Sequence, residues 1–142
     1  MSTVRVATDS SKVVVEGKEV NISIGHAYRL VLWLDAEGGS RVVVVRNGGD
    51  AMIDLSLSSL LRRWKSWRFD DYPLAMPATP RVYVDGRALR RWRTIVCSVS
   101  GRTIWIHRRG QEIQVSICSH VLAVFTRHTA YIALPRGFRT VM

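Results

Sequence analysis

Acidic residues are scarce over most of this chain of 142 residues. Residues 55–142 contain four Asp or Glu against fifteen Lys or Arg, whereas residues 1–54 contain seven acidic and six basic residues. Enzymes that cleave nucleic acids with Mg²⁺ need several clustered carboxylates to hold the metal. The shortage of acids therefore argues against that chemistry in the basic part of the chain.

The glycine-rich phosphate loops of nucleotide-binding enzymes are also missing. The chain contains neither GxxxxGK(S/T) nor a GxGxxG that follows a strand, and Gly38-Gly39 and Gly48-Gly49 are interpreted as turns. Cys118 and His120 lie close in sequence and are residue types that can bind zinc or act as a nucleophile and its base. No second such pair and no orienting carboxylate lie near them in sequence. We therefore expect no cofactor and no metal site, and we assign no catalytic residue. An enzyme that acts on an anionic substrate is kept as a third alternative.

Long apolar runs are absent as well. No stretch reaches the roughly 20 apolar residues that span a bilayer, and Met1–Ser11 lacks the apolar segment of a secretory signal. We therefore expect no membrane partner and a cytoplasmic location, or a virion or host cytoplasm if the source is a virus.

Cysteines and side-chain amides are few. Cys97 and Cys118 both lie in apolar, β-like runs and are interpreted as small core residues; a disulfide between them requires neighbouring strands. The only amide side chains belong to Asn21, Asn47, Gln111 and Gln114. Depletion of thermolabile amides is a tendency of thermophile proteins, so a hot-environment source is a hypothesis.

The overall composition is that of a globular protein. Hydrophobic residues make up 47% of the chain and charged residues 23%, which argues against disorder. We expect one domain over residues 1–142, with a near-neutral part (1–54) and a strongly basic part (55–142).

Hydropathy alternation predicts a chain made mostly of short β-strands. Val13–Val15 and Val20–Ile24 flank a Gly-containing turn and are expected to pair as a hairpin, as are Tyr28–Leu34 and Arg41–Arg46. The β-branched run Val42–Val45 predicts a strand covered on both faces. Further strands are expected in a hairpin turning at Asp85-Gly86 and in a C-terminal meander, over Val82–Val84, Arg87–Leu89, Thr94–Val99, Arg102–His107, Glu112–Ile117, Val121–Thr126 and Ala130–Leu134.

One amphipathic helix is expected over about residues 54–69. Its apolar stripe has helical period and consists of Leu57, Leu60, Leu61, Trp64 and Trp67. Asp54, Ser56 or Ser58 is expected to cap its N-terminus. With about nine or ten strands and one helix, the fold class is α+β, mainly β: an antiparallel sheet, or a partly open barrel or sandwich.

Arginine is what the chain has in excess. It supplies eighteen of the 21 basic residues, and the formal charge is −1 over residues 1–54 and +11 over 55–142, which sums to +10. A GC-rich genome accounts for the preference for Arg over Lys but not for the position of the charges. Such asymmetry indicates a polyanionic partner, because basic groups near phosphates release condensed counterions.

Aromatic residues are interleaved with this charge. Residues 62–109 contain twelve basic residues together with Trp64, Trp67, Trp92 and Trp105, and nucleic-acid grooves combine cations with stacking aromatic faces. Trp64 and Trp67 belong to the helix stripe and are interpreted as core. The residues expected to contact nucleic acid are Arg62, Arg63, Lys65, Arg90, Arg91, Trp92, Arg93, Trp105, Arg108 and Arg109.

Trp105 is the sharper candidate for stacking. Period-2 alternation places Ile104 and Ile106 on one face of their strand and Trp105 and His107 on the other. The next strand is expected to add Gln114 and Ser116 beside them. If the helix covers this face instead, Trp105 is a second-layer core residue.

The sequence thus favours a non-enzymatic nucleic-acid-binding module with mainly electrostatic, weakly sequence-specific binding to DNA or RNA. The alternative is a structural or assembly protein that forms a homo-oligomer, because many short strands leave sheet edges that pair readily.

Overall fold

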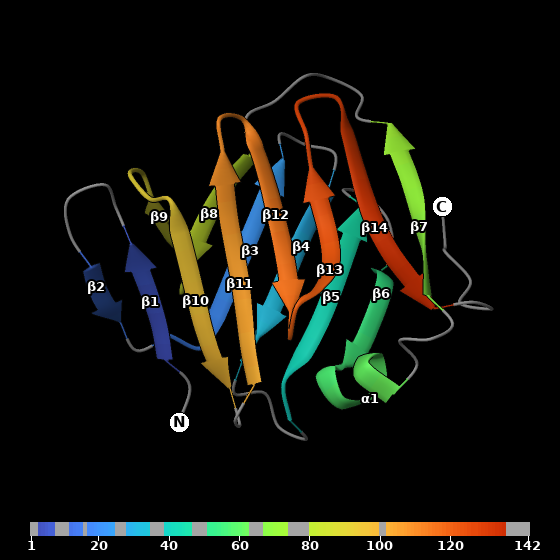
Figure 1. The fold of residues 1–142 in the computed structure, drawn as a ribbon, viewed down its shortest axis with the longest axis horizontal. Helices are drawn as coiled ribbons and strands as arrows, with labels where there is room; N and C mark the ends of the chain where they lie inside the picture. The colour runs from blue at the N-terminus through green and yellow to red at the C-terminus, as the bar shows by residue number, and fades with distance from the viewer. Residues whose placement is uncertain are drawn as a thin grey trace.

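The computed structural model describes residues 3–7, 12–15, 17–24, 28–34, 39–46, 51–62, 67–73, 80–99 and 102–135. These residues form fourteen strands in two antiparallel sheets and one short helix, α1 (Leu57–Arg62). The two sheets lie as two layers, one behind the other (Figure 1). The mainly β class expected from the sequence is confirmed.

The front layer of Figure 1 is an eight-stranded sheet. Its strands, in order of neighbours, are β2 (Lys12–Val15), β1 (Thr3–Ala7), β10 (Thr94–Val99), β11 (Arg102–Arg109), β12 (Glu112–Ile117), β13 (His120–Phe125), β14 (Thr129–Pro135) and β7 (Trp67–Pro73). The five strands β10 to β14 follow one another as an antiparallel meander, as expected from the sequence.

The second layer is a six-stranded sheet. Its strands, in order of neighbours, are β6 (Ala51–Ser56), β5 (Arg41–Arg46), β4 (Tyr28–Trp33), β3 (Glu19–Ile24), β8 (Pro80–Val84) and β9 (Arg87–Leu89). The expected hairpins β4–β5 and β8–β9 are both present. Asp85 and Gly86 turn the second one with φ of 48° and 83°, the positive values of a type I′ turn.

One core fills the space between the layers. It draws fully buried side chains from both sheets, among them Ile22 and Leu32 of the six-stranded sheet and Ile106, Val115 and Phe125 of the eight-stranded sheet. Alternation along each strand supplies this inner face. The run Val42, Val43 and Val44 is buried on successive residues, so the prediction of a strand covered on both faces is confirmed.

The first expected hairpin is wrong. β2 pairs with β1 in the eight-stranded sheet, whereas β3 pairs with β4 and β8 in the six-stranded sheet, so the chain crosses between layers where a turn was expected. Gly17 is buried at this crossing, and a Cβ there would lie 2.8 Å from Val4 Cγ2. The close approach of the two layers explains the glycine better than a turn does.

Hydrogen bonds from both neighbours of β3 in the six-stranded sheet stabilise the crossing. Asp85 Oδ1 accepts hydrogen bonds from the backbone N–H groups of Lys18 (3.0 Å) and Glu19 (2.8 Å). The N–H of Leu34 donates to the carbonyl of Lys18 (2.7 Å). The β8–β9 turn and the end of β4 therefore hold the start of β3 in register.

The helix is much shorter than the expected span of 54–69. Asp54 to Ser56 end β6, which pairs with β5, and Trp67 to Phe69 begin β7, which pairs with β14; residues 63–66 and Trp64 lie outside the described residues. Ladder hydrogen bonds to distant strands override the local helical period. Of the three predicted caps, Ser56 caps the helix: its Oγ accepts the N–H of Ser59 (3.1 Å). Leu57 packs into the core.

The sequence pattern missed three of the fourteen strands in the described residues, β1, β6 and β7. The other eleven each overlap an expected range and slightly exceed the expected total of about nine or ten. β1 lies between β2 and β10 and extends the sheet of the meander by one strand.

Candidate nucleic-acid interface

The surface of the eight-stranded sheet that faces away from the core carries Trp105 and His107. On β11, Ile104 and Ile106 are buried in the core, while the Trp105 side chain between them is 39% exposed. The expected alternation is therefore confirmed. Trp105 is not a second-layer core residue, since a helix laid over it would remove this exposure.

The rings of Trp105 and His107 are stacked. Their centroids lie 5.6 Å apart and their planes differ by 6°. Residues two apart on a strand project from the same face about 6.6 Å apart, so the two rings need only lean together to touch. The result is an aromatic surface two rings long.

Polar side chains flank this stack as predicted. Ser116 lies opposite Trp105 in the register of β11 and β12, and Gln114 lies opposite His107. The Gln114 amide donates a hydrogen bond to Ser116 Oγ at 3.3 Å. Hydrogen-bonding groups thus stand beside an exposed aromatic ring, which is the combination that reads a stacked base.

Two further residues of this face were not predicted. Arg5 of β1 lies opposite Val96, which lies opposite Trp105, and Arg5 is exposed. Tyr131 of β14 continues the row of His107 and Gln114 through Val124, and its side chain is 39% exposed. We call this surface the outer face, and we define it by Arg5, Trp105, His107, Gln114 and Tyr131.

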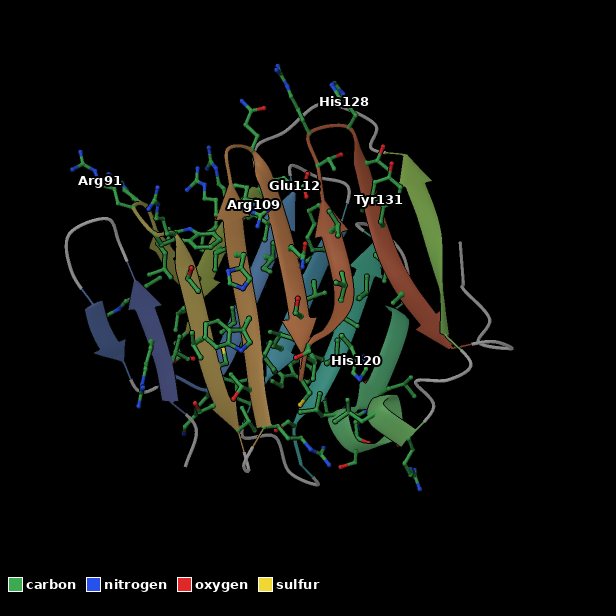
Figure 2. The ribbon with its side chains drawn as sticks, viewed as in Figure 1. Arg91, Arg109, Glu112, His120, His128 and Tyr131 are labelled. Atoms are coloured by element: carbon green, nitrogen blue, oxygen red, sulfur yellow. The ribbon has the colours of Figure 1, made fainter. Side chains whose placement is uncertain are left out.

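Arginines gather at one end of the same sheet. Because neighbouring strands are antiparallel, the start of β10, the β11–β12 turn and the β13–β14 turn all lie at the same end of the sheet. The backbone N–H of Arg108 donates a hydrogen bond to the Arg93 carbonyl there, at 2.9 Å. Figure 2 shows Arg91, Arg109 and His128 at this edge. We call it the arginine end; its members are Arg90, Arg91, Arg93, Arg108, Arg109 and Arg127.

Acidic residues are few in the described segments that carry these arginines. Residues 90–93, 107–112 and 126–129 contain the six arginines and a single acidic residue, Glu112. Glu112 lies opposite Arg109 in the register of β11 and β12. A hollow of about 180 Å³, lined by His107, Arg109, Glu112 and Gln114, connects the arginine end with the outer face.

Trp92 does not belong to the accessible surface. Its side chain is 6% exposed and packs in the core, and the Arg108 guanidinium lies 5.6 Å from its ring centroid. The prediction that Trp92 offers a stacking face is therefore wrong: of the two tryptophans named for that role, Trp105 has the open ring.

The predicted basic residues divide between two ends of the molecule. Arg90, Arg91, Arg93, Arg108 and Arg109 come together at the arginine end. Arg62 ends α1, which lies at the opposite end in Figure 1. There Arg102, at the start of β11, donates to Ser58 Oγ (3.2 Å), about 24 Å along β11 from Arg109. Arg63 and Lys65 lie outside the described residues.

The cysteines do not form a site. Both are free thiols, and β11 separates the strand of Cys97 from that of Cys118. Cys97 is in the core as predicted, and burial raises its pKa to about 12. Cys118 is exposed, contrary to the prediction, because it occupies the β12–β13 turn with Ser119, both with positive φ.

Two further features, a metal-binding cluster and a membrane-spanning helix, are not found in the described part of the chain. Its His, Cys, Asp and Glu side chains form no cluster of three or more suited to a metal ion. Its one helix lacks the length and apolar character needed to cross a bilayer. Comparisons with protein-family models, with curated proteins and with solved structures found no match to this chain.

Proposed function

We propose that this protein binds nucleic acid, with the arginine end holding the phosphate backbone and the outer face stacking one or two bases. The observation that carries the proposal is the adjacency of six arginines to the exposed Trp105–His107 stack. Phosphate contacts position a strand, and an aromatic ring accepts any base. Binding is therefore mainly electrostatic and weakly sequence-specific.

Single strands are the favoured form. Stacking on Trp105 requires an unpaired base, since bases in a duplex are already stacked on each other. Tyr131 lies three strands from His107, about 15 Å away, a distance that an extended strand spans within a few nucleotides. Arg5 lies two strands from Trp105 in the opposite direction and extends the positive charge across the outer face.

A charge-matched pair of variants tests the proposal. Arg91→Gln/Arg109→Gln removes two exposed cations from the arginine end, and Arg62→Gln with Arg87→Gln removes two exposed cations from elsewhere. Fluorescence anisotropy with a labelled single-stranded oligonucleotide is the measurement. We expect the first variant to bind about tenfold more weakly than the native protein. The change in the logarithm of the affinity is expected to be less than half as large for the second variant. Equal losses in both variants contradict a localised interface.

A homo-oligomer is the alternative proposal, and sheet edges support it. Within the described residues, β2, β7, β6 and β9 each pair with one neighbour and offer a free edge to another chain. Light scattering at tens of micromolar tests it, and a monomer at that concentration contradicts it. The two proposals are compatible, because a basic oligomer can package nucleic acid.

A further inference from the structure

A second basic cavity lies where the two sheets meet at the arginine end. It has a volume of about 480 Å³ and opens between the β8–β9 hairpin and the end of β11. Arg81, Tyr83, Arg90, Trp92 and Arg108 line it, with apolar wall from Leu89. It is separate from the outer face, since Trp105 and His107 are not among its lining residues.

Three arginines converge on this cavity from three segments. Arg108 comes from β11, Arg81 from β8 and Arg90 from the segment after β9. Val82 of β8 pairs with Leu89 of β9, and Arg81 and Arg90 are the next residues along these two chain segments, beyond that pair. The pairing of two strands thus brings two cations to one mouth of the cavity.

Two contacts position the Arg108 guanidinium group beside the cavity. Its guanidinium lies 5.6 Å from the centroid of the Trp92 ring, and its Nε donates to the Gly110 carbonyl at 3.4 Å. The ring is buried, so it cannot swing away. A cation held in this manner loses little conformational entropy on binding an anion.

The charge of the cavity has no internal partner in the part of the chain that the structure describes. Among its described lining residues the cavity has three guanidinium groups and no carboxylate, and the Arg41–Asp54 ion pair lies on the far edge of the six-stranded sheet. Forked guanidinium groups match the oxygens of a phosphate. Three of these groups carry more positive charge than a monoanion neutralises.

We propose that this cavity binds a phosphate monoester, carried either by a free nucleotide or by the 5′ end of a strand. Its volume falls within the range of small-ligand sites, and the half-buried Tyr83 ring gives it an aromatic wall that suits the attached nucleoside. The inference does not rest on the proposed function, since a nucleotide can occupy the cavity whether or not the outer face binds a strand.

Calorimetric titration of the full-length protein with adenosine 5′-monophosphate, and with adenosine as the ligand that lacks the phosphate, tests the site. We expect saturable binding of the monophosphate at one site per chain and no binding of adenosine. Arg90→Gln weakens the monophosphate by about tenfold, because it removes a charge-assisted contact. Arg87→Gln is the matched control: it removes the same charge from an exposed residue of β9 that does not line the cavity, and is expected to change affinity less than twofold.

Oligonucleotides with and without a 5′-phosphate then identify the source of the phosphate. A 5′-phosphate preference that disappears in Arg90→Gln but not in Arg87→Gln assigns the cavity to strand ends; equal affinities, with the monophosphate still bound, assign it to a free nucleotide. Arg90 is exposed and outside the strands, so its variant retains the fold even if Arg108→Gln does not. The proposal is overturned if the monophosphate and adenosine bind equally or not at all, or if Arg87→Gln weakens binding as much as Arg90→Gln does.

Discussion

The rings of His107 and Trp105 stack on the outer face of the eight-stranded sheet, with their centroids 5.6 Å apart, and neither ring contributes to the core. A large exposed aromatic ring with a fixed neighbour is ready to accept a third ring. The imidazole limits the rotation of the indole, so a base that stacks there finds the surface already ordered.

Replacement of the indole tests this arrangement. Trp105→Ala is expected to weaken single-stranded oligonucleotide binding by about 1–3 kcal/mol, the usual contribution of one stacked base, and Trp105→Phe is expected to retain most of the affinity. Trp33→Ala is the control, because Trp33 is 40% exposed on the six-stranded sheet. Anisotropy is the measurement, and an effect of Trp33→Ala as large as that of Trp105→Ala contradicts a stacking role.

Thiol reactivity distinguishes the two cysteines. Burial raises the pKa of Cys97 to about 12 from 9.0, so near pH 8 its thiol is protonated as well as shielded, whereas Cys118 is exposed in a turn. A chromogenic disulfide reagent is expected to titrate one thiol rapidly in the folded protein and two after unfolding. Cys118→Ser is expected to abolish the rapid phase, and a rapid phase that persists in this variant contradicts the assignment.

The crossing between the sheets predicts a stability effect at Gly17. A Cβ at this position would lie 2.8 Å from Val4 Cγ2 and 3.1 Å from Val84 Cγ1, so Gly17→Ala is expected to lower the free energy of unfolding by about 1–3 kcal/mol. Urea denaturation measures it. Because the clash is with Val4, Val4→Ala is expected to cost less in the Gly17→Ala background than in the native chain; strict additivity contradicts the proposed contact.

Local patterns predicted the parts of the fold that depend on neighbours in sequence. The alternation of Ile104, Trp105, Ile106 and His107 was enough to assign the two faces of β11, because the meander pairs each strand with the next. The type I′ turn at Asp85-Gly86 was recognisable for the same reason.

Features that depend on distant pairing were not predictable in this way. The apolar stripe beginning at Leu57 has helical period, yet its end at Trp67 pairs with β14, more than sixty residues further along the chain. Arg5 joins the outer face only through the pairing of β1 with β10. Trp92 is buried because Arg108 and the sheet edge close over it, which no feature of Arg90–Arg93 reveals.

The salt dependence of single-strand binding tests the central proposal most directly. Anisotropy titrations of a labelled single-stranded oligonucleotide with the native protein, at several salt concentrations, give the slope of log affinity against log salt. If the arginine end neutralises four or more phosphates, the slope is expected to be about −3 or steeper, since each phosphate on a single strand contributes about −0.7. A slope near zero, or no binding at low salt, contradicts the proposal that the arginine end binds nucleic acid.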